Sequence, residues 1–156
     1  MDVAEIRYHE GRVVSAVVIK TNEILLVKYC FGDGNVKYML PGCRILHGEA
    51  PKEAIRRGCM QETGISIEAE DIIFARLDDL EWQISFRARY LAGTLKAPDN
   101  EPFVPLWLQA EDALKLENLS FLYKEQIKSA LAGKNSLRYK KQLDLSSGKH
   151  RCFYAL

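Results

Sequence analysis

A chain of 156 residues is long enough for one globular domain with a substantial hydrophobic core. Its 22 basic and 21 acidic residues leave a net charge of +1, so the charge of the whole chain does not indicate nucleic-acid or membrane-surface binding. The charged start, Met1 to Arg7, is unlike a secretory signal, and the most apolar run, Val13 to Ile19, falls far short of the ~18 residues that span a bilayer. The four cysteines include no C-x-x-C pair, so we expect reduced thiols and a cytoplasmic location without membrane contact.

The first half of the chain predicts three strands followed by a helix. Val- and Ile-rich segments predict strands over 12–20, 24–29 and 36–40. A loop is expected over Pro41 to Glu49. The helix after it has Pro51 in its first turn and Gly64 at its C-cap, positions that each residue favours.

The second half predicts more strands and a last helix. Short strands are expected over 65–67 and 72–77, a strand over 103–108, and a helix over 121–131 that Ser120 caps. Apolar and polar residues alternate from Trp82 to Tyr90, which predicts a half-buried strand with one polar face. These elements together predict an α/β fold with a mixed β-sheet flanked by helices, placed in a domain over 1–133.

The loop and helix from Cys43 to Ile65 carry the most informative motif. This segment resembles the Nudix box, GX5EX7REUXEEXGU with U a bulky aliphatic residue, without insertion or deletion. The matching positions are Glu49, Arg57, Glu62, Gly64 and Ile65. The resemblance extends over 12–131 and implies a Nudix-type α/β/α sandwich, in which Glu49 pairs with Arg57 to tie the loop to the helix.

Three positions depart from the box. Cys43 replaces its first Gly, Gly58 the Glu that follows the Arg, and Gln61 the first Glu of the pair. Positions 58, 61 and 62 share one helix face, and in the family that face presents carboxylates to divalent cations. The resemblance therefore implies Mg²⁺ or Mn²⁺ held weakly here, with Glu62 as the principal ligand and Gln61 as a weaker one.

Gly58 permits two compatible interpretations. A glycine inside a helix costs about 1 kcal/mol relative to alanine, so it indicates either close packing of the helix or a metal site that has decayed or been remodelled. If the metal site has decayed, Glu at positions 58 and 61 should restore the carboxylates. We expect the helix to tolerate both, because Glu is a better helix former than Gly.

Other charged residues are candidates for supporting roles. Asp99 and Glu101, before the strand at 103, could supply a further acidic ligand or the general base. Asp78, Asp79 and Glu81 are weaker candidates for that role. Arg87 and Arg89 could receive phosphate, with simple solvation as the alternative. We expect Glu53 to form a surface ion pair with Arg57, one turn further along the helix.

Residues 134–156 form a basic C-terminal extension with the pattern of a β-hairpin. Six basic residues stand against Asp144, a local charge of +5: Lys134, Arg138, Lys140, Lys141, Lys149 and Arg151. Such a hairpin could contact nucleic acid or a nucleotide. The favoured alternative is a solvated extension that covers a sheet edge or contacts a second copy in a homodimer.

The leading hypothesis is a divergent Nudix hydrolase. It would cleave a nucleoside diphosphate linked to another moiety by metal-assisted attack of water. The alternative is a non-catalytic Nudix module that binds a nucleotide, RNA or a protein partner. The changes at Gly58 and Gln61 favour the second hypothesis, whereas the intact loop with Arg57 and Glu62 favours the first.

Overall fold

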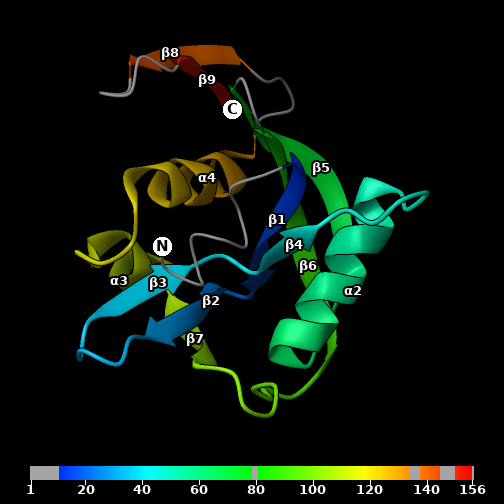
Figure 1. The fold of residues 1–156 in the computed structure, drawn as a ribbon, viewed down its shortest axis with the longest axis vertical. Helices are drawn as coiled ribbons and strands as arrows, with labels where there is room; N and C mark the ends of the chain where they lie inside the picture. Colours follow the sequence, from blue (N-terminus) through cyan, green and yellow to red (C-terminus); the bar gives the residue numbers. More distant parts are fainter. Residues whose placement is uncertain (1–10, 79–80, 134–137, 145–149, 156) are drawn as a thin grey trace.

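A computed structural model describes residues 11–78, 81–133, 138–144 and 150–155. Its strands form one mixed sheet in the order β3-β2-β1-β6-β5-β9-β8, with β4 paired to β1 and β7 paired to β2 (Figure 1). The elements are β1 (Gly11–Lys20), β2 (Glu23–Cys30), β3 (Val36–Met39), β4 (Gly42–Arg44), α2 (Pro51–Thr63), β5 (Ile65–Asp78), β6 (Glu81–Gly93), β7 (Phe103–Gln109), α3 (Ala110–Lys115), α4 (Phe121–Ala132), β8 (Arg138–Asp144) and β9 (His150–Ala155).

Strand β1 lies at the centre of the fold and separates two hydrophobic clusters. It runs parallel to β6 and antiparallel to β4. Because side chains alternate along a strand, Val14, Ala16 and Val18 pack in the cluster beneath α2. Val17 packs in the opposite cluster, beneath α3 and α4. The predicted α/β sandwich, with a mixed sheet flanked by helices, is therefore confirmed (Figure 1).

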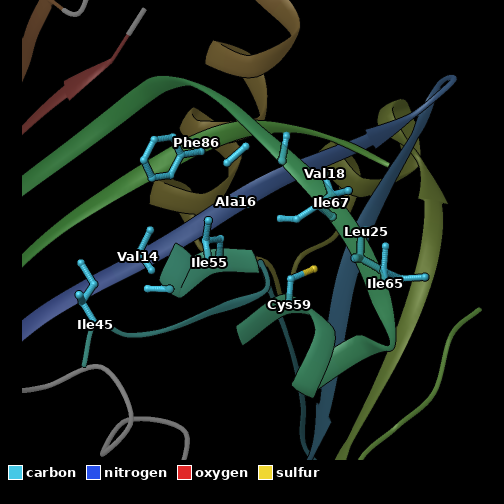
Figure 2. Packing of buried hydrophobic residues seen from close by; sticks show 13 residues of the cluster. Val14, Ala16, Val18, Leu25, Ile45, Ile55, Cys59, Ile65, Ile67 and Phe86 are labelled. Atoms are coloured by element: carbon cyan, nitrogen blue, oxygen red, sulfur yellow. The ribbon is translucent and has the colours of Figure 1, made fainter. Parts of the chain in front are cut away.

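Helix α2 begins and ends as the sequence predicts. Pro51 occupies the first turn, and the Glu53 carboxylate accepts a hydrogen bond from the Ala50 backbone N–H at 3.2 Å. Gly64 ends the helix in the left-handed conformation, with φ of 76°. Between these ends, Ile55 and Cys59 face the sheet and are completely buried in the cluster drawn in Figure 2. This packing holds α2 firmly against β1.

The polar face of β6 differs from the prediction. Gln83 and Ser85 are buried rather than solvated, because α4 covers this face. Gln83 Nε2 donates to Ser15 Oγ at 2.9 Å, and Ser85 Oγ donates to Gln126 Oε1 at 2.6 Å. Buried polar groups are costly unless they are hydrogen-bonded, so this network allows a polar strand face to lie in the interior.

Two further elements differ from the sequence-based boundaries, whereas the predicted pairing of strands in the C-terminal extension is present. The expected loop over 41–49 contains the short strand β4, which pairs with β1. The two short strands expected after the helix form the single strand β5, interrupted by irregularities in its pairing with β6. In the C-terminal extension β8 and β9 form an antiparallel pair, and β9 also pairs with β5. Lys134 and Lys149 of that extension lie outside the described residues.

We predict that the described thiols react with iodoacetamide in the order of their exposure. Cys30 is exposed, Cys43 is partly buried and Cys59 is buried. Burial also raises the pKa of Cys59 to about 12, so its reactive thiolate is scarce at neutral pH. Peptide mapping by mass spectrometry should find Cys30 labelled first and Cys59 protected until denaturant is added. Equal labelling of Cys30 and Cys59 in the native protein would contradict the packing of α2.

Candidate active site

A pocket of about 400 Å³ opens between α2, β4 and the loop before β7. All three positions that depart from the Nudix box lie in its wall. It is lined by Gly42, Cys43, Arg44, Arg57, Gly58, Gln61, Glu62, Pro98 and Glu101. The volume is within the range of pockets that take small-molecule ligands. This is the candidate active site.

One ion pair ties the loop before α2 to the helix. Arg57 Nε donates to Glu49 Oε1 at 2.8 Å, and Arg57 Nη2 donates to Glu49 Oε2 at 3.0 Å. The same Nη2 also donates to the Arg44 carbonyl at 3.0 Å, which connects β4 to the pair. Such two-point charged hydrogen bonds fix geometry more strongly than single contacts do. Loop, helix and β4 are therefore held together through the Arg57 guanidinium.

The hydrogen bonds from Arg57, together with one from the Leu46 N–H at 3.0 Å, lower the pKa of the Glu49 carboxyl. Glu53 contributes differently from the expectation. The Glu53 carboxylate accepts a hydrogen bond from the Ala50 N–H at the start of the helix, and the Arg57 guanidinium is paired with Glu49. The predicted surface ion pair between Glu53 and Arg57 is wrong, because each group has a nearer partner.

Gln61 points its carbonyl oxygen at the same guanidinium. Arg57 Nη1 donates to Gln61 Oε1 at 3.1 Å. A divalent cation at this oxygen would lie beside a fixed positive charge, and the two would repel each other. The geometry therefore disfavours Gln61 as a metal ligand.

Glu62 lies in the pocket wall with only 5% of its surface exposed. An ordinary exposed helix charge would be solvated, so this placement sets Glu62 apart from the other acidic residues of α2. Partial burial strengthens the interaction of a carboxylate with any cation beside it. Glu62 is thus the carboxylate on the helix side of the pocket.

Gly58 meets Cys43 across the pocket wall. A Cβ atom built on Gly58 would lie 2.5 Å from Cys43 Sγ and 2.7 Å from Cys43 Cβ, closer than real atoms approach. Cys43 Sγ also donates to the Ala54 carbonyl at 3.1 Å. The close-packing interpretation of Gly58 therefore describes this contact with β4. The expectation that α2 tolerates Glu at position 58 is wrong while Cys43 is present, because the two side chains need one space.

The two acidic candidates before β7 are placed differently. Glu101 lines the pocket together with residues of α2, whereas Asp99 is not among the lining residues. Glu81 is buried against Arg76 at the start of β6, away from the pocket. Asp79 lies outside the described residues, as does the side chain of Asp78. Glu101 is therefore the acidic candidate that the fold brings into one pocket with Glu62.

The two arginines of β6 lie elsewhere. Arg87 Nε donates to the Ala130 carbonyl at 2.9 Å, and Arg87 Nη1 lies 3.8 Å from Asp71. These contacts connect β6 with α4 and β5. Arg89 lies 3.6 Å from Glu70, with 63% of its side chain exposed. The structure brings neither arginine to the pocket, so their predicted contact with phosphate has no support from this geometry.

The donor set limits how a metal ion could be held. Among the side chains that the structure describes, no group of three or more His, Cys, Asp or Glu residues is arranged to hold a metal ion. The pocket offers two carboxylates outside the ion pair, those of Glu62 and Glu101. Magnesium is commonly bound through one or two carboxylates together with substrate phosphates and water. The residues therefore fit a cation shared with a phosphate ligand, and they do not form a complete protein cage.

Reasoning from the sequence missed two features of this pocket. The first feature is that Arg44 and Pro98 line the pocket, although the Nudix box specifies no residue at either position. The second feature is the contact between Cys43 and Gly58. A signal for it was present, because a small residue becomes larger at position 43 while a large one becomes glycine at position 58.

Comparison with known proteins agrees with this architecture. The model of the NUDIX domain matches residues 9–129, so the chain belongs to the Nudix family. Members of this family generally use divalent metals. Putative nudix hydrolase 1 of Caenorhabditis elegans is 27% identical over 115 residues, which cover 69% of this chain and 32% of the relative. The chain thus spans about a third of that relative's length.

Solved structures show the same fold. A NUDIX hydrolase from Nitrosomonas europaea has a TM-score of 0.67 at 18% identity, covering 81% of this chain and 91% of that chain. An ADP-ribose pyrophosphatase from Streptococcus suis has a TM-score of 0.62 at 21% identity, covering 80% and 92% respectively. Within the part of the chain that the structure describes, no helix is long and apolar enough to cross a membrane.

We predict that Glu49→Gln lowers the melting temperature by about 2–4 °C at neutral pH, the equivalent of roughly 1 kcal/mol. Because Arg57 lowers the pKa of Glu49 from its ordinary value of 4.5, the carboxylate stabilises the protein above that pH. The contribution disappears as the pH falls through the lowered pKa, where Glu49 becomes protonated in the folded state.

The measurement is thermal unfolding of both proteins from pH 7 to pH 3, where the two melting temperatures should converge. Glu125→Gln is the matched control, since its pair with Lys128 lies on an exposed helix surface and should contribute little. A difference between Glu49→Gln and the parent that stays constant with pH would rule out the ion pair as its cause.

Proposed function

We propose that this protein is a divergent Nudix pyrophosphohydrolase. Its substrate would be a nucleoside diphosphate linked to another moiety, cleaved by attack of water on phosphorus. The observation that carries the proposal is the placement of Glu62 and Glu101 in one pocket, next to the Glu49–Arg57 pair. Two carboxylates facing a small-molecule pocket provide a place for both a cation and a proton acceptor.

Each residue has a distinct role in this proposal. Glu62 would hold Mg²⁺ or Mn²⁺ together with phosphate oxygens of the substrate. The bound cation would neutralise phosphate charge and lower the pKa of an attacking water. Glu101, at the exposed rim, would accept the proton from that water. Glu49 and Arg57 are positioning residues that keep the loop, β4 and α2 in register around the pocket.

The cation should bind weakly to the free protein. Two carboxylates supply less charge than the family's box implies, and Gln61 directs its oxygen toward Arg57. We therefore expect a magnesium affinity in the millimolar range without ligand, and tighter binding once phosphate oxygens complete the coordination. Isothermal titration with magnesium, with and without a nucleotide, measures both values. A micromolar magnesium site in the free protein would show that the ligands are others.

The similarity to an ADP-ribose pyrophosphatase supports the substrate class without naming a substrate. The activity in that protein's name, hydrolysis of a pyrophosphate, is of the reaction type proposed here. The free thiols of Cys30, Cys43 and Cys59 support a reducing, cytoplasmic location.

We also propose a structural role for residues 134–156. The pairing of β9 with β5 supports an extension that covers a sheet edge, and β8 then forms the new edge. This pairing favours a structural role over a contact with nucleic acid. An edge strand is also a place at which a second copy could pair to form a homodimer.

A second candidate function is a non-catalytic Nudix module that binds a nucleotide, RNA or a protein partner. The contact of Cys43 with Gly58 favours it, because this contact fills the space of one metal-binding carboxylate. The neutral Gln61 removes another. The pocket would then accept the same kind of phosphate ligand without cleaving it, and its affinity would not depend strongly on a cation.

A hydrolysis screen distinguishes the two candidates. Nucleotide sugars, dinucleoside polyphosphates and nucleoside triphosphates should be tested with magnesium and with manganese. For any substrate cleaved, we predict that Glu62→Gln and Glu101→Gln each lower kcat/KM at least tenfold, or about 1.4 kcal/mol of barrier. Glu53→Gln is the matched control, because Glu53 lies on the same helix outside the pocket wall. Binding of these nucleotides by calorimetry without any cleavage would support the non-catalytic module.

A further inference from the structure

We propose that Cys43 closes position 58 of this pocket to a metal-binding side chain. Its side chain occupies the space that a side chain at position 58 requires, so Cys43 and Gly58 act as one steric unit. The inference deepens the proposed function, because it concerns the same pocket. Its test measures stability and metal binding, so it does not depend on detecting hydrolysis.

The contact cannot be relieved by rotating the thiol. A Cβ at position 58 would lie 2.7 Å from Cys43 Cβ, an atom whose position the backbone of β4 fixes. Rotation about the Cα–Cβ bond moves Sγ and leaves this clash in place. Relief therefore requires β4 and α2 to move apart.

Neither element is free to move. Val14 and Ser15 of β1 pair with Cys43 and Gly42 of β4. A Cβ built on Gly42 would already lie 2.8 Å from the Val14 carbonyl oxygen, so β4 lies close against β1. On the other side, α2 is held by completely buried side chains, including Ile55 and Cys59. Separating the two elements would disrupt this packing, which is why the sizes at positions 43 and 58 depend on each other.

The exchange of side-chain sizes between positions 43 and 58 also changes the charge of the pocket. In the Nudix box, position 43 is glycine and position 58 is glutamate, whereas this chain has cysteine and glycine. Cys43 does not replace the lost anion, because burial raises the pKa of its thiol to about 11 and keeps it neutral at pH 7. Glu62 and Glu101 then remain as the pocket's anions outside the Glu49–Arg57 pair. A cation therefore needs the phosphates of a ligand to complete its coordination.

The steric contact predicts that the effect of Gly58→Ala on the melting temperature has opposite signs in the parent and in a Cys43→Gly background. Four proteins measure it: the parent, each single variant and the double variant. Gly58→Ala in the parent should lower the melting temperature by at least about 2 °C, although alanine is the better helix former. In a Cys43→Gly background the same change should raise it by about 2–4 °C, because the clash is gone and helix propensity decides.

Gly32→Ala is the matched control for this cycle. No heavy atom lies within 4 Å of a Cβ built on Gly32, and Gly32 is not among the glycines with positive φ. Its effect should be the same in the parent and in the Cys43→Gly background. Stabilisation by Gly58→Ala in the parent, or an equal effect in both backgrounds, would overturn the steric unit.

The metal part compares two proteins with the same new carboxylates. One carries Gly58→Glu and Gln61→Glu, and the other carries Cys43→Gly in addition. With 10 mM magnesium or manganese in place of EDTA, the triple variant should gain at least about 3 °C in melting temperature. The double variant, in which Cys43 still blocks position 58, should gain less than half as much.

Equal gains in the two variants would overturn the role of Cys43, as would the absence of any gain in the triple variant. If the triple variant does not fold, the alanine cycle still decides the steric part, since it introduces no charge. Failure of the proposed hydrolysis would look different. The parent would then cleave no substrate in the screen, while the sign change and the metal response described above would remain.

Discussion

The Glu49–Arg57 ion pair is the interaction on which the rest of the pocket depends. One guanidinium holds the loop through Glu49, the strand β4 through the Arg44 carbonyl, and its own helix through Gln61. Its planar fork of donors makes such a three-way connection possible, which a lysine ammonium could not reproduce. The pocket wall is therefore built around a fixed positive charge.

That fixed charge explains why the change at Gln61 matters beyond the loss of one carboxylate. The amide oxygen accepts from Arg57, so a metal ion at this oxygen would lie beside the positive charge of the guanidinium. Together with the neutral thiol of Cys43, this arrangement makes the helix side of the pocket poor in anions apart from Glu62. A phosphate ligand would meet less repulsion here than in a pocket with all the carboxylates of the box.

Strand β1 connects the fold to this pocket. Its apolar residues position α2, and its pairing with β4 sets the distance between β4 and the helix. Its other face carries Ser15, which joins Ser85 and Gln126 in the buried network beneath α4. Hydrogen-bond networks of this kind require defined geometry. The side of β1 toward α2 thus uses apolar packing, whereas the other side combines the apolar packing of Val17 with the hydrogen bonds of Ser15.

The sequence by itself determined the strand and helix pattern around the box, the start of α2 at Pro51 and its end at Gly64, and the role of Glu49 with Arg57. These features depend on local spacing and on a fixed motif. Only the tertiary structure decided which residues share the pocket. The approach of Glu101 to α2 and the contact of Cys43 with Gly58 join residues from different elements. Such contacts depend on how closely elements pack, which spacing along the chain does not encode.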